Sequence, residues 1–237
     1  VQKKITIEYV KEKDEKNNFK IEDNFFIKKS TNNKIKIGYY SSDFRGHAVS
    51  HLLAGVIEKH NKNEFEIIGF SLSSSKRDEM RERLEKSFDK LIDVSSKSDH
   101  EIYELSKSLN IDIAIDLMGF TKLNRFGVFL KKCAPIQINY LGYPGTSGSN
   151  SIDYIIGDKT IISKKNERNF TEKIIYLPDT YQANDSKRKI SIKKFLRKDF
   201  NLPEDQFVFC CFNKKYKLDP KIFNLWTNIL KKVPNSV

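Results

Sequence analysis

The sequence predicts an α/β protein in which a mostly parallel sheet carries helices on its faces. Short β-branched runs alternate with longer amphipathic segments from residue 34 onward, and this alternation is typical of βαβ units. Residues 207–212 are almost wholly apolar, as are strands that are buried on both faces of a parallel sheet. A hydrophobic fraction of 38% with 12% aromatic residues is enough for a core, which excludes a disordered chain.

The first domain is expected over residues 34–200. Apolar residues at helical spacing indicate its first helix within 47–60, and Ser98 or Asp99 is the expected N-cap of a later helix. The predicted strands are 34–40, 64–72, 91–94, 111–118, 136–143 and 152–158, and the predicted helices are 47–60, 76–88 and one that starts near residue 98.

The segments on either side of this domain have a different character. Residues 1–33 are polar and contain no Gly or Pro, so we interpret them as a linker or a loosely ordered lead-in. Residues 201–237 begin a second domain, in which the strand 207–212 is followed by a helix. Asp219 and Pro220 form the N-cap and the first turn of that helix. Because one βα unit cannot form a sheet, this second domain is expected to be incomplete.

The composition argues against three classes of protein. A net charge of +12 would suit a nucleic-acid partner, but the lysines are spread along the chain without an arginine-rich arm, so we interpret them as solvated surface. Cys133, Cys210 and Cys211 have neither the pattern of a disulfide framework nor metal-ligand spacing, so no metal site is predicted. No apolar run reaches the roughly 18 residues of a membrane span. We expect a cytoplasmic protein that binds neither nucleic acid nor membrane.

Polar residues after the first predicted strand form the first candidate site, because ligands of open α/β sheets bind beyond the carboxyl ends of the strands. In the segment 41–47, Asp43 and His47 lie four residues apart and Gly46 permits a tight turn. A carboxylate beside an imidazole suits a general base for a hydroxyl nucleophile. The alternative is that Asp43 or Ser42 caps the following helix while His47 lines its first turn. The spacing alone favours this alternative.

Two further loops follow later strands. In residues 116–122, Gly119 is flanked by Asp116 and Thr121, either of which could act as a cap, and this signal is weak. Residues 141–148 hold three glycines and a proline, so their backbone N–H groups are open to close approach by a sugar or a phosphate. The loop has neither P-loop nor dinucleotide-binding spacing, and a purely structural loop is an equal alternative.

The fourth candidate segment is FNKKYK, residues 212–217, which follows the apolar strand directly. Lysines at the carboxyl end of a strand and before a helix are well placed to meet a diphosphate. The alternative is a solvated run of charge.

Together, these loops and their neighbours resemble one family. The blocks YYSSDFRGHAVSHL, IDLMGFTKLNRFGVFLKKCAPIQINYLGYPGTSG and FNKKYKLDPKIFNLWTNILKKVPNSV are similar to successive blocks of the O-linked N-acetylglucosamine transferases of the SPINDLY type, glycosyltransferase family 41. The resemblance covers residues 34–237 in order and is strongest to bacterial members. It implies that the chain is a fragment that holds the N-terminal catalytic lobe and the start of the donor-binding lobe.

The family resemblance implies a fold and a reaction. The fold is the GT-B architecture, two Rossmann-like lobes with the active site between them, usually behind a tetratricopeptide superhelix. The reaction is an inverting transfer of GlcNAc from UDP-GlcNAc to Ser or Thr hydroxyls of a protein acceptor, without metal or cofactor. Some relatives use GDP-fucose or UDP-glucose instead, so the donor sugar stays open.

The resemblance also assigns roles to single residues. His47 matches a general-base candidate, Asp43 a rival for the same proton, and Lys217 the lysine that neutralises the donor diphosphate. The residues that correspond to donor-binding or substrate-binding positions are Gly142, Tyr143, Pro144, Thr146, Asn213, Lys214 and Tyr216.

This chain departs from the family pattern at several positions. Many members have glutamine at the position of Lys214 and proline at that of Ala48, and Met118 and Phe120 also differ. Because Lys214 departs from the family pattern, the resemblance does not determine which contacts this chain makes with the donor. The chain by itself is expected to be inactive, and the alternative function is a non-catalytic scaffold that binds proteins through a truncated or degenerate lobe.

Overall fold

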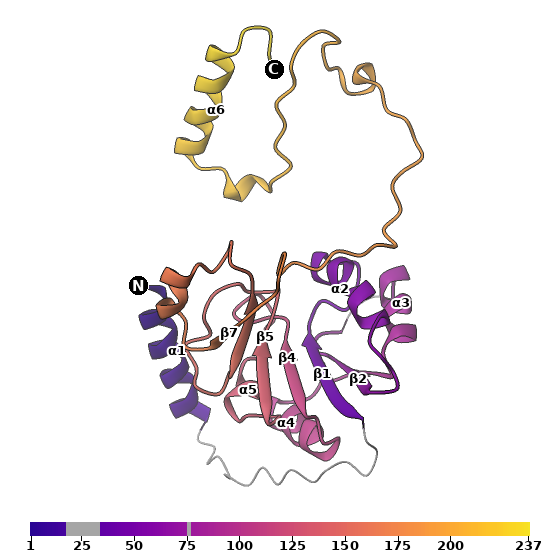
Figure 1. Ribbon diagram of the computed structural model, residues 1–237, viewed down its shortest axis with the longest axis vertical. Helices are drawn as coiled ribbons and strands as arrows, with labels where there is room; N and C mark the ends of the chain where they lie inside the picture. Colours follow the sequence, from indigo (N-terminus) through magenta and orange to yellow (C-terminus); the bar gives the residue numbers. More distant parts are fainter. Residues whose placement is uncertain (18–33, 75–76) are drawn as a thin grey trace. The chain divides into compact units, whose positions relative to one another are not determined.

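The computed structural model describes residues 1–17, 34–74 and 77–237 (Figure 1). The chain folds into two compact units, Val1–Arg188 and Lys189–Val237. The sequence predicts this division after residue 200, so the second unit begins earlier than expected.

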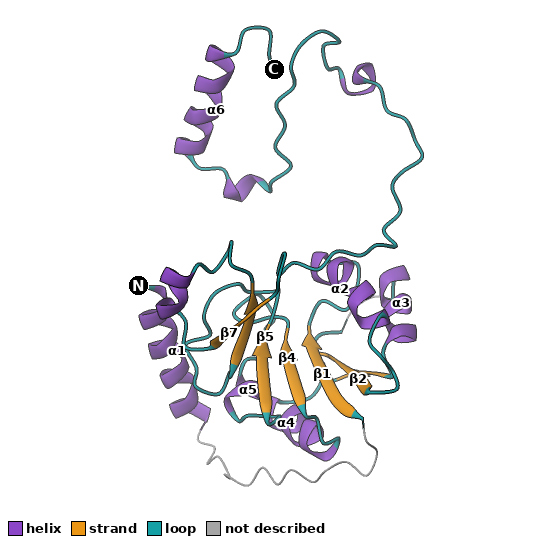
Figure 2. Ribbon diagram, viewed as in Figure 1, coloured by secondary structure: helices purple, strands orange, loops and turns teal. Residues whose placement is uncertain are grey.

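The first unit is built on a sheet of seven parallel strands in the order β3-β2-β1-β4-β5-β6-β7. The parallel α/β fold predicted from the sequence is therefore confirmed (Figure 2). Strand order reverses between β1 and β4, and all the carboxyl ends lie at one edge of the sheet. β7 is not among the strands that the sequence predicts. The strands are β1 Ile35–Ser41, β2 Phe65–Ser71, β3 Lys90–Asp93, β4 Ile113–Asp116, β5 Ile136–Asn139, β6 Tyr154–Gly157 and β7 Lys173–Tyr176.

Helices cover both faces of this sheet because alternate strand residues point to opposite sides. One buried cluster joins Ile37 and Ile67 of the sheet to Leu53 of α2 and Leu84 of α3. The helices of the first unit are α1 Gln2–Asn17, α2 Ala48–Glu58, α3 Glu79–Ser87, α4 Asp99–Ser108 and α5 Gly127–Leu130, with a 3₁₀ helix at Lys164–Asn169.

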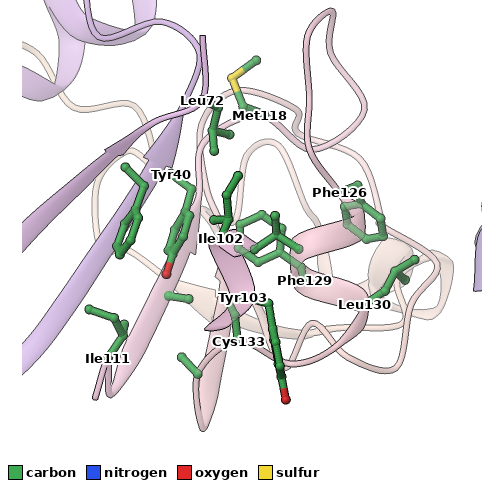
Figure 3. Packing of buried hydrophobic residues seen from close by; sticks show 14 of the residues in the cluster. Tyr40, Leu72, Ile102, Tyr103, Ile111, Met118, Phe126, Phe129, Leu130 and Cys133 are labelled. Carbon is green, nitrogen blue, oxygen red and sulfur yellow. The ribbon is translucent and has the colours of Figure 1, made fainter. Parts of the chain in front are cut away.

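The second buried cluster lies on the opposite face (Figure 3). Tyr40 of β1 stacks on Phe70 of β2 with ring centroids 4.3 Å apart, and it meets Ile102 of α4 and Phe129 of α5. The Tyr40 hydroxyl donates to Ser106 Oγ at 2.8 Å, so this buried polar group has a partner. Of the two N-caps predicted for α4, Ser98 is the one observed, and it forms a capping box with Glu101.

The amino-terminal segment differs from its prediction. The sequence predicts a linker or a loosely ordered lead-in over residues 1–33, but Gln2–Asn17 forms the helix α1. Thr6 and Val10 of this helix are buried, and Val10 belongs to the cluster around Tyr40. The apolar residues of α1 are not gathered on one face, so its position depends on tertiary packing and periodicity does not reveal it. The rest of that predicted segment, 18–33, lies outside the described residues.

The second unit contains the predicted helix as α6, Pro220–Lys232. Asp219 is its N-cap and accepts from the Ile222 N–H at 2.8 Å, as the sequence predicts. The predicted buried strand 207–212 is not observed. Phe207 forms an isolated parallel bridge with Ser236, and Phe212 is 95% exposed. An apolar run becomes a buried strand only where neighbouring strands pair with it, and this is the only β-bridge of that run among the described residues. Two 3₁₀ turns complete this unit, Arg197–Phe200 and Lys215–Lys217.

Candidate active site

Loops that follow β1, β4 and β5 contact one another at the carboxyl edge of the sheet. The Ser42 hydroxyl, after β1, donates to the carbonyl of Leu123 at 2.7 Å in the loop after β4. Gly119 of that second loop lies against Tyr143 of the loop after β5. The strand order reverses between β1 and β4, which is where open α/β sheets bind their ligands. Three of the four candidate segments are therefore brought together.

His47 and Asp43 meet in the loop after β1. His47 is the N-cap of α2, and its Nδ1 accepts from the Val49 N–H at 3.4 Å. The same Nδ1 lies 3.5 Å from Asp43 Oδ2. The His47 side chain is 41% exposed, whereas the Asp43 carboxylate is 12% exposed. His47 thus caps the helix and also lies beside a carboxylate, and these two contacts of Nδ1 need opposite tautomers of the ring. When Nδ1 accepts from Val49, the neutral ring carries its proton on Nε2. When the proton is instead on Nδ1, facing Asp43 Oδ2, Nε2 is the nitrogen that can take a proton from a ligand.

Asp78 holds this loop in place from the start of α3. Its Oδ2 accepts from the Gly46 N–H at 2.7 Å, while its Oδ1 accepts from the Arg81 N–H at 2.8 Å. The hydrogen bond from Gly46 is the largest cause of a lowered pKa at Asp78, followed by the one from Arg81. Sequence reasoning missed this role. An Asp before a helix predicts an N-cap. The contact with Gly46 joins residues 32 positions apart, so no local pattern predicts it.

Asp116 organises the loop after β4. Its carboxylate is buried and accepts from the N–H groups of Met118 at 2.8 Å and Gly119 at 3.0 Å. Burial raises the pKa of Asp116 to about 6, against the opposing effect of the two hydrogen bonds. Asp116 therefore caps a turn, while Thr121 donates its hydroxyl to the Met118 carbonyl instead of capping. A helix follows only at Gly127.

The loop after β5 presents its tip outward. A Cβ at Gly142 would overlap the carbonyl of Leu117, so a side chain there would push the loop away from the β4 strand end. Asn139 Nδ2 donates to the carbonyls of Tyr143 and Gly145, both at 3.2 Å. Pro144, between these two residues, is exposed. The backbone of the tip is thus fixed while Pro144 stays exposed.

Thr146 differs from the loop tip because it is only 3% exposed. Its hydroxyl donates to Glu172 Oε2 at 2.8 Å and accepts from the N–H groups of Gly148 and Thr171. These contacts commit the hydroxyl to the interior of the lobe.

The remaining predicted site residues lie in the second unit. Lys214 precedes the 3₁₀ turn Lys215–Lys217, and its carbonyl accepts from the Lys217 N–H at 2.9 Å. Tyr216 is 76% exposed, and Asn213 Nδ2 donates to Cys211 Sγ at 3.5 Å. One turn therefore presents several cationic and polar side chains to solvent. Such a surface can bind an anionic group such as a diphosphate.

Comparison with known proteins identifies the family of this chain. The chain matches glycosyl transferase family 41 over residues 4–195 and 183–237. The chain belongs to glycosyltransferase family 41. The first family match includes most of α1, so the family pattern starts before the first strand.

Family 41 relatives share much of this sequence. A probable UDP-N-acetylglucosamine–peptide N-acetylglucosaminyltransferase of Arabidopsis thaliana, named SEC, is 40% identical over 208 residues, which are 86% of this chain and 21% of the relative. A UDP-N-acetylglucosamine–peptide N-acetylglucosaminyltransferase of Caenorhabditis elegans is 34% identical over 153 residues, 64% of this chain and 13% of the relative. The chain spans about a fifth or less of the length of these relatives.

A solved structure of family 41 supports the fold. An O-GlcNAc transferase mutant of Thermobaculum terrenum matches with a TM-score of 0.76 and 27% identity over 86% of this chain and 38% of that one. The predicted assignment to a GT-B glycosyltransferase with a Rossmann-like first lobe is confirmed at the level of fold and family.

Clustered metal ligands and membrane-spanning helices are both absent from the described part of this family 41 chain. No group of three or more His, Cys, Asp or Glu side chains within residues 1–17, 34–74 and 77–237 could hold a metal ion. Within the same ranges, no helix is long and apolar enough to cross a bilayer.

Proposed function

We propose that the protein to which this chain belongs transfers GlcNAc from UDP-GlcNAc to Ser or Thr hydroxyls of proteins, with inversion and without a metal. The names of the relatives support the donor and the peptide acceptor. The observation that carries the proposal is the contact between His47 and Asp43 at the carboxyl edge of the sheet, next to the β4 and β5 loops. Three free cysteines agree with a reducing, cytoplasmic location.

The proposed reaction assigns one task to each group. The acceptor oxygen bonds to the anomeric carbon from the face opposite the diphosphate, and the bond between that carbon and the diphosphate oxygen breaks. With the ring proton on Nδ1, facing the Asp43 carboxylate, His47 Nε2 takes the hydroxyl proton, and that carboxylate stabilises the imidazolium that forms. Asp43 is the rival base, since its Oδ2 lies only 3.5 Å from the same ring.

Donor recognition is proposed to use the loop after β5 and the turn Lys215–Lys217. The backbone of Gly142, Tyr143 and Pro144 would face the sugar and the acceptor, because the tip of that loop is outward-facing and its conformation is fixed. Lys217 would neutralise the charge that develops on the leaving diphosphate. The exposed turn around Lys217 supports this role. The residues proposed to assist it are Asn213, Lys214 and Tyr216.

The test exploits the double role of His47. His47→Asn keeps an N-cap for α2, because Asn is a preferred capping residue, but it removes the imidazole. In the full-length protein, we expect turnover with UDP-GlcNAc and an acceptor peptide to fall about 10²- to 10⁴-fold while the melting temperature stays within a few degrees. The matched control is His51→Asn. His51 is exposed one helical turn further along α2, and turnover there should stay within about threefold.

Two outcomes would contradict the proposal. Equal turnover in His47→Asn and wild type would leave proton transfer to Asp43 or to another group. No transfer from any UDP- or GDP-sugar by the wild-type protein would instead favour the non-catalytic scaffold.

A further inference from the structure

The connection between β5 and β6 poses a structural problem that Glu172 solves. Two neighbouring parallel strands need a crossover from one edge of the sheet to the other, and a helix usually supplies it. Here residues 140–153, all of which the structure describes, contain no helix. Residues 146–149 of this crossover are nevertheless buried. Their backbone N–H groups therefore need acceptors other than the carbonyls of a helix.

Glu172, directly before β7, provides these acceptors. It is only 5% exposed, and its Oε1 accepts from both the backbone N–H of Ser147, at 2.6 Å, and the Ser147 hydroxyl. Its Oε2 accepts from the Thr146 hydroxyl at 2.8 Å and from the N–H and hydroxyl of Thr171 at 3.1 and 3.2 Å. Five donors thus satisfy one buried carboxylate, which offsets the cost of burying its charge.

The two hydroxyls extend this anchor along the loop. Thr146 Oγ1 donates to Glu172 and accepts from the Gly148 N–H at 3.2 Å. Ser147 Oγ donates to Glu172 and accepts from the Ser149 N–H at 3.3 Å. Three successive N–H groups therefore depend on one carboxylate, directly or through a hydroxyl.

The anchored segment continues directly into the loop tip. Asn139 holds the tip by donating to the carbonyls of Tyr143 and Gly145. Glu172 accepts a hydrogen bond from the hydroxyl of the next residue, Thr146. The tip at Pro144 is thus fixed on both sides. Loss of either support would let the tip move relative to the Asp43–His47 pair.

We propose that Glu172 is a positioning residue for sugar transfer: its buried carboxylate fixes the return half of the 141–148 loop, so that the tip keeps its conformation when donor and acceptor bind. This inference rests on the proposed function for its catalytic consequence, but not for the loop anchoring itself. It also assigns Thr146 a structural role, in which its hydroxyl donates a hydrogen bond to Glu172.

Glu172→Gln tests the inference with a change of almost no volume. An amide has one acceptor oxygen and one NH₂ group, so in either orientation the NH₂ must face the N–H of Ser147 or of Thr171. The matched control is Asp158→Asn. Asp158 is also buried, and both of its oxygens accept backbone N–H groups, from Thr160, Ile161 and Tyr181.

The first measurement is amide hydrogen exchange in the 237-residue chain, with unfolding by urea as the measure of global stability. In Glu172→Gln, exchange at residues 147–149 should rise tenfold or more beyond the rise in Asp158→Asn at equal global stability. Equal exchange at 147–149 in the two variants would overturn the inference.

The second measurement is sugar transfer by the full-length protein carrying the same variants. Glu172→Gln should lower kcat tenfold or more with a smaller change in the KM for the donor, whereas Asp158→Asn should leave kcat within threefold. A loosened loop with unchanged kcat would overturn the positioning role. If the wild-type protein transfers no sugar, the proposed function fails, while the exchange experiment still decides whether Glu172 anchors the loop.

Discussion

At the scale of single residues, two kinds of acidic side chain hold or lie in the loops around the candidate site. One group holds backbone N–H groups and so fixes loops. Asp43 differs, because the contacts of its carboxylate are with the side chains of Arg45, at 3.4 Å, and His47. A carboxylate directed at an imidazole is available for proton chemistry in a way that a capping carboxylate is not. The capping group comprises Asp78, Asp116, Asp158 and Glu172.

Asp78 permits a test of loop anchoring that spares the helix cap. In Asp78→Asn, the amide oxygen can still accept from Arg81, but its NH₂ then faces the Gly46 N–H. We expect faster amide exchange at Gly46 and His47, and a loss of about 0.5–1.5 kcal/mol in the free energy of unfolding, because the exposed Gly46 N–H then bonds to water instead of the carboxylate. Ser98→Ala is the control. It should cost about 1 kcal/mol through the cap of α4 without changing exchange at Gly46. Unchanged exchange at Gly46 in Asp78→Asn would contradict the anchoring role.

At the scale of elements, α1 connects the loops after β4 and β5. Tyr9 meets Phe120 with ring centroids 5.5 Å apart, and Gln2 Nε2 donates to the Tyr143 hydroxyl at 2.5 Å. Thr6 lies against Gly148, whose φ of +68° favours glycine, and a Cβ there would fall 2.5 Å from Thr6 Oγ1. The helix therefore packs against one side of the glycine-rich loop and leaves Pro144 exposed, and its docking and the loop conformation depend on each other.

Two adjacent positions of α1 test this dependence. Thr6 is 7% exposed, whereas Ile5 is 60% exposed, so Thr6→Lys places a charge in the contact and Ile5→Lys places one in solvent. We expect Thr6→Lys to abolish amide protection over residues 2–17, because an isolated helix of this length is marginally stable in water. Exchange at residues 143–148 should also rise. Ile5→Lys should change neither region. Full protection of α1 in Thr6→Lys would show that the helix does not depend on this contact.

At the scale of the whole molecule, the elements that the sequence predicts correctly are those whose signals lie within a short stretch of the chain. The parallel sheet, α2, α4 and α6 follow from periodicity and capping residues, and the site loops follow from their position after strands. The features that sequence reasoning missed depend on distant contacts. Glu172 meets residues 25 positions away, and α1 is stabilised by burial of Thr6 and Val10. The run 207–212 shows the converse, since β propensity without pairing strands yields only an isolated bridge.

Carboxyl groups with shifted pKa values also give the whole molecule opposing responses to pH. Burial raises the pKa of Asp116 from 3.8 to about 6. Between these values the folded chain binds more protons than the unfolded chain, so stability falls by about 3 kcal/mol as the pH rises. Hydrogen bonds from Arg83 lower the pKa values of Glu58 and Asp185 to about 2. Between about pH 2 and 4.5 the unfolded chain binds more of these protons, so stability falls as the pH drops.

These responses predict a maximum of stability between about pH 4 and 5, if the two sets of carboxyl groups dominate titration in that range. Urea unfolding from pH 2.5 to 7 would measure it. Asp116→Asn should flatten the decline above pH 4, because its amide does not titrate, whereas Asp185→Asn should flatten the decline below pH 4. The two variants are controls for each other, since each should leave the other slope in place. An unchanged slope above pH 4 in Asp116→Asn would show that this carboxyl stays ionised in the folded lobe, held by the N–H groups of Met118 and Gly119 despite its burial.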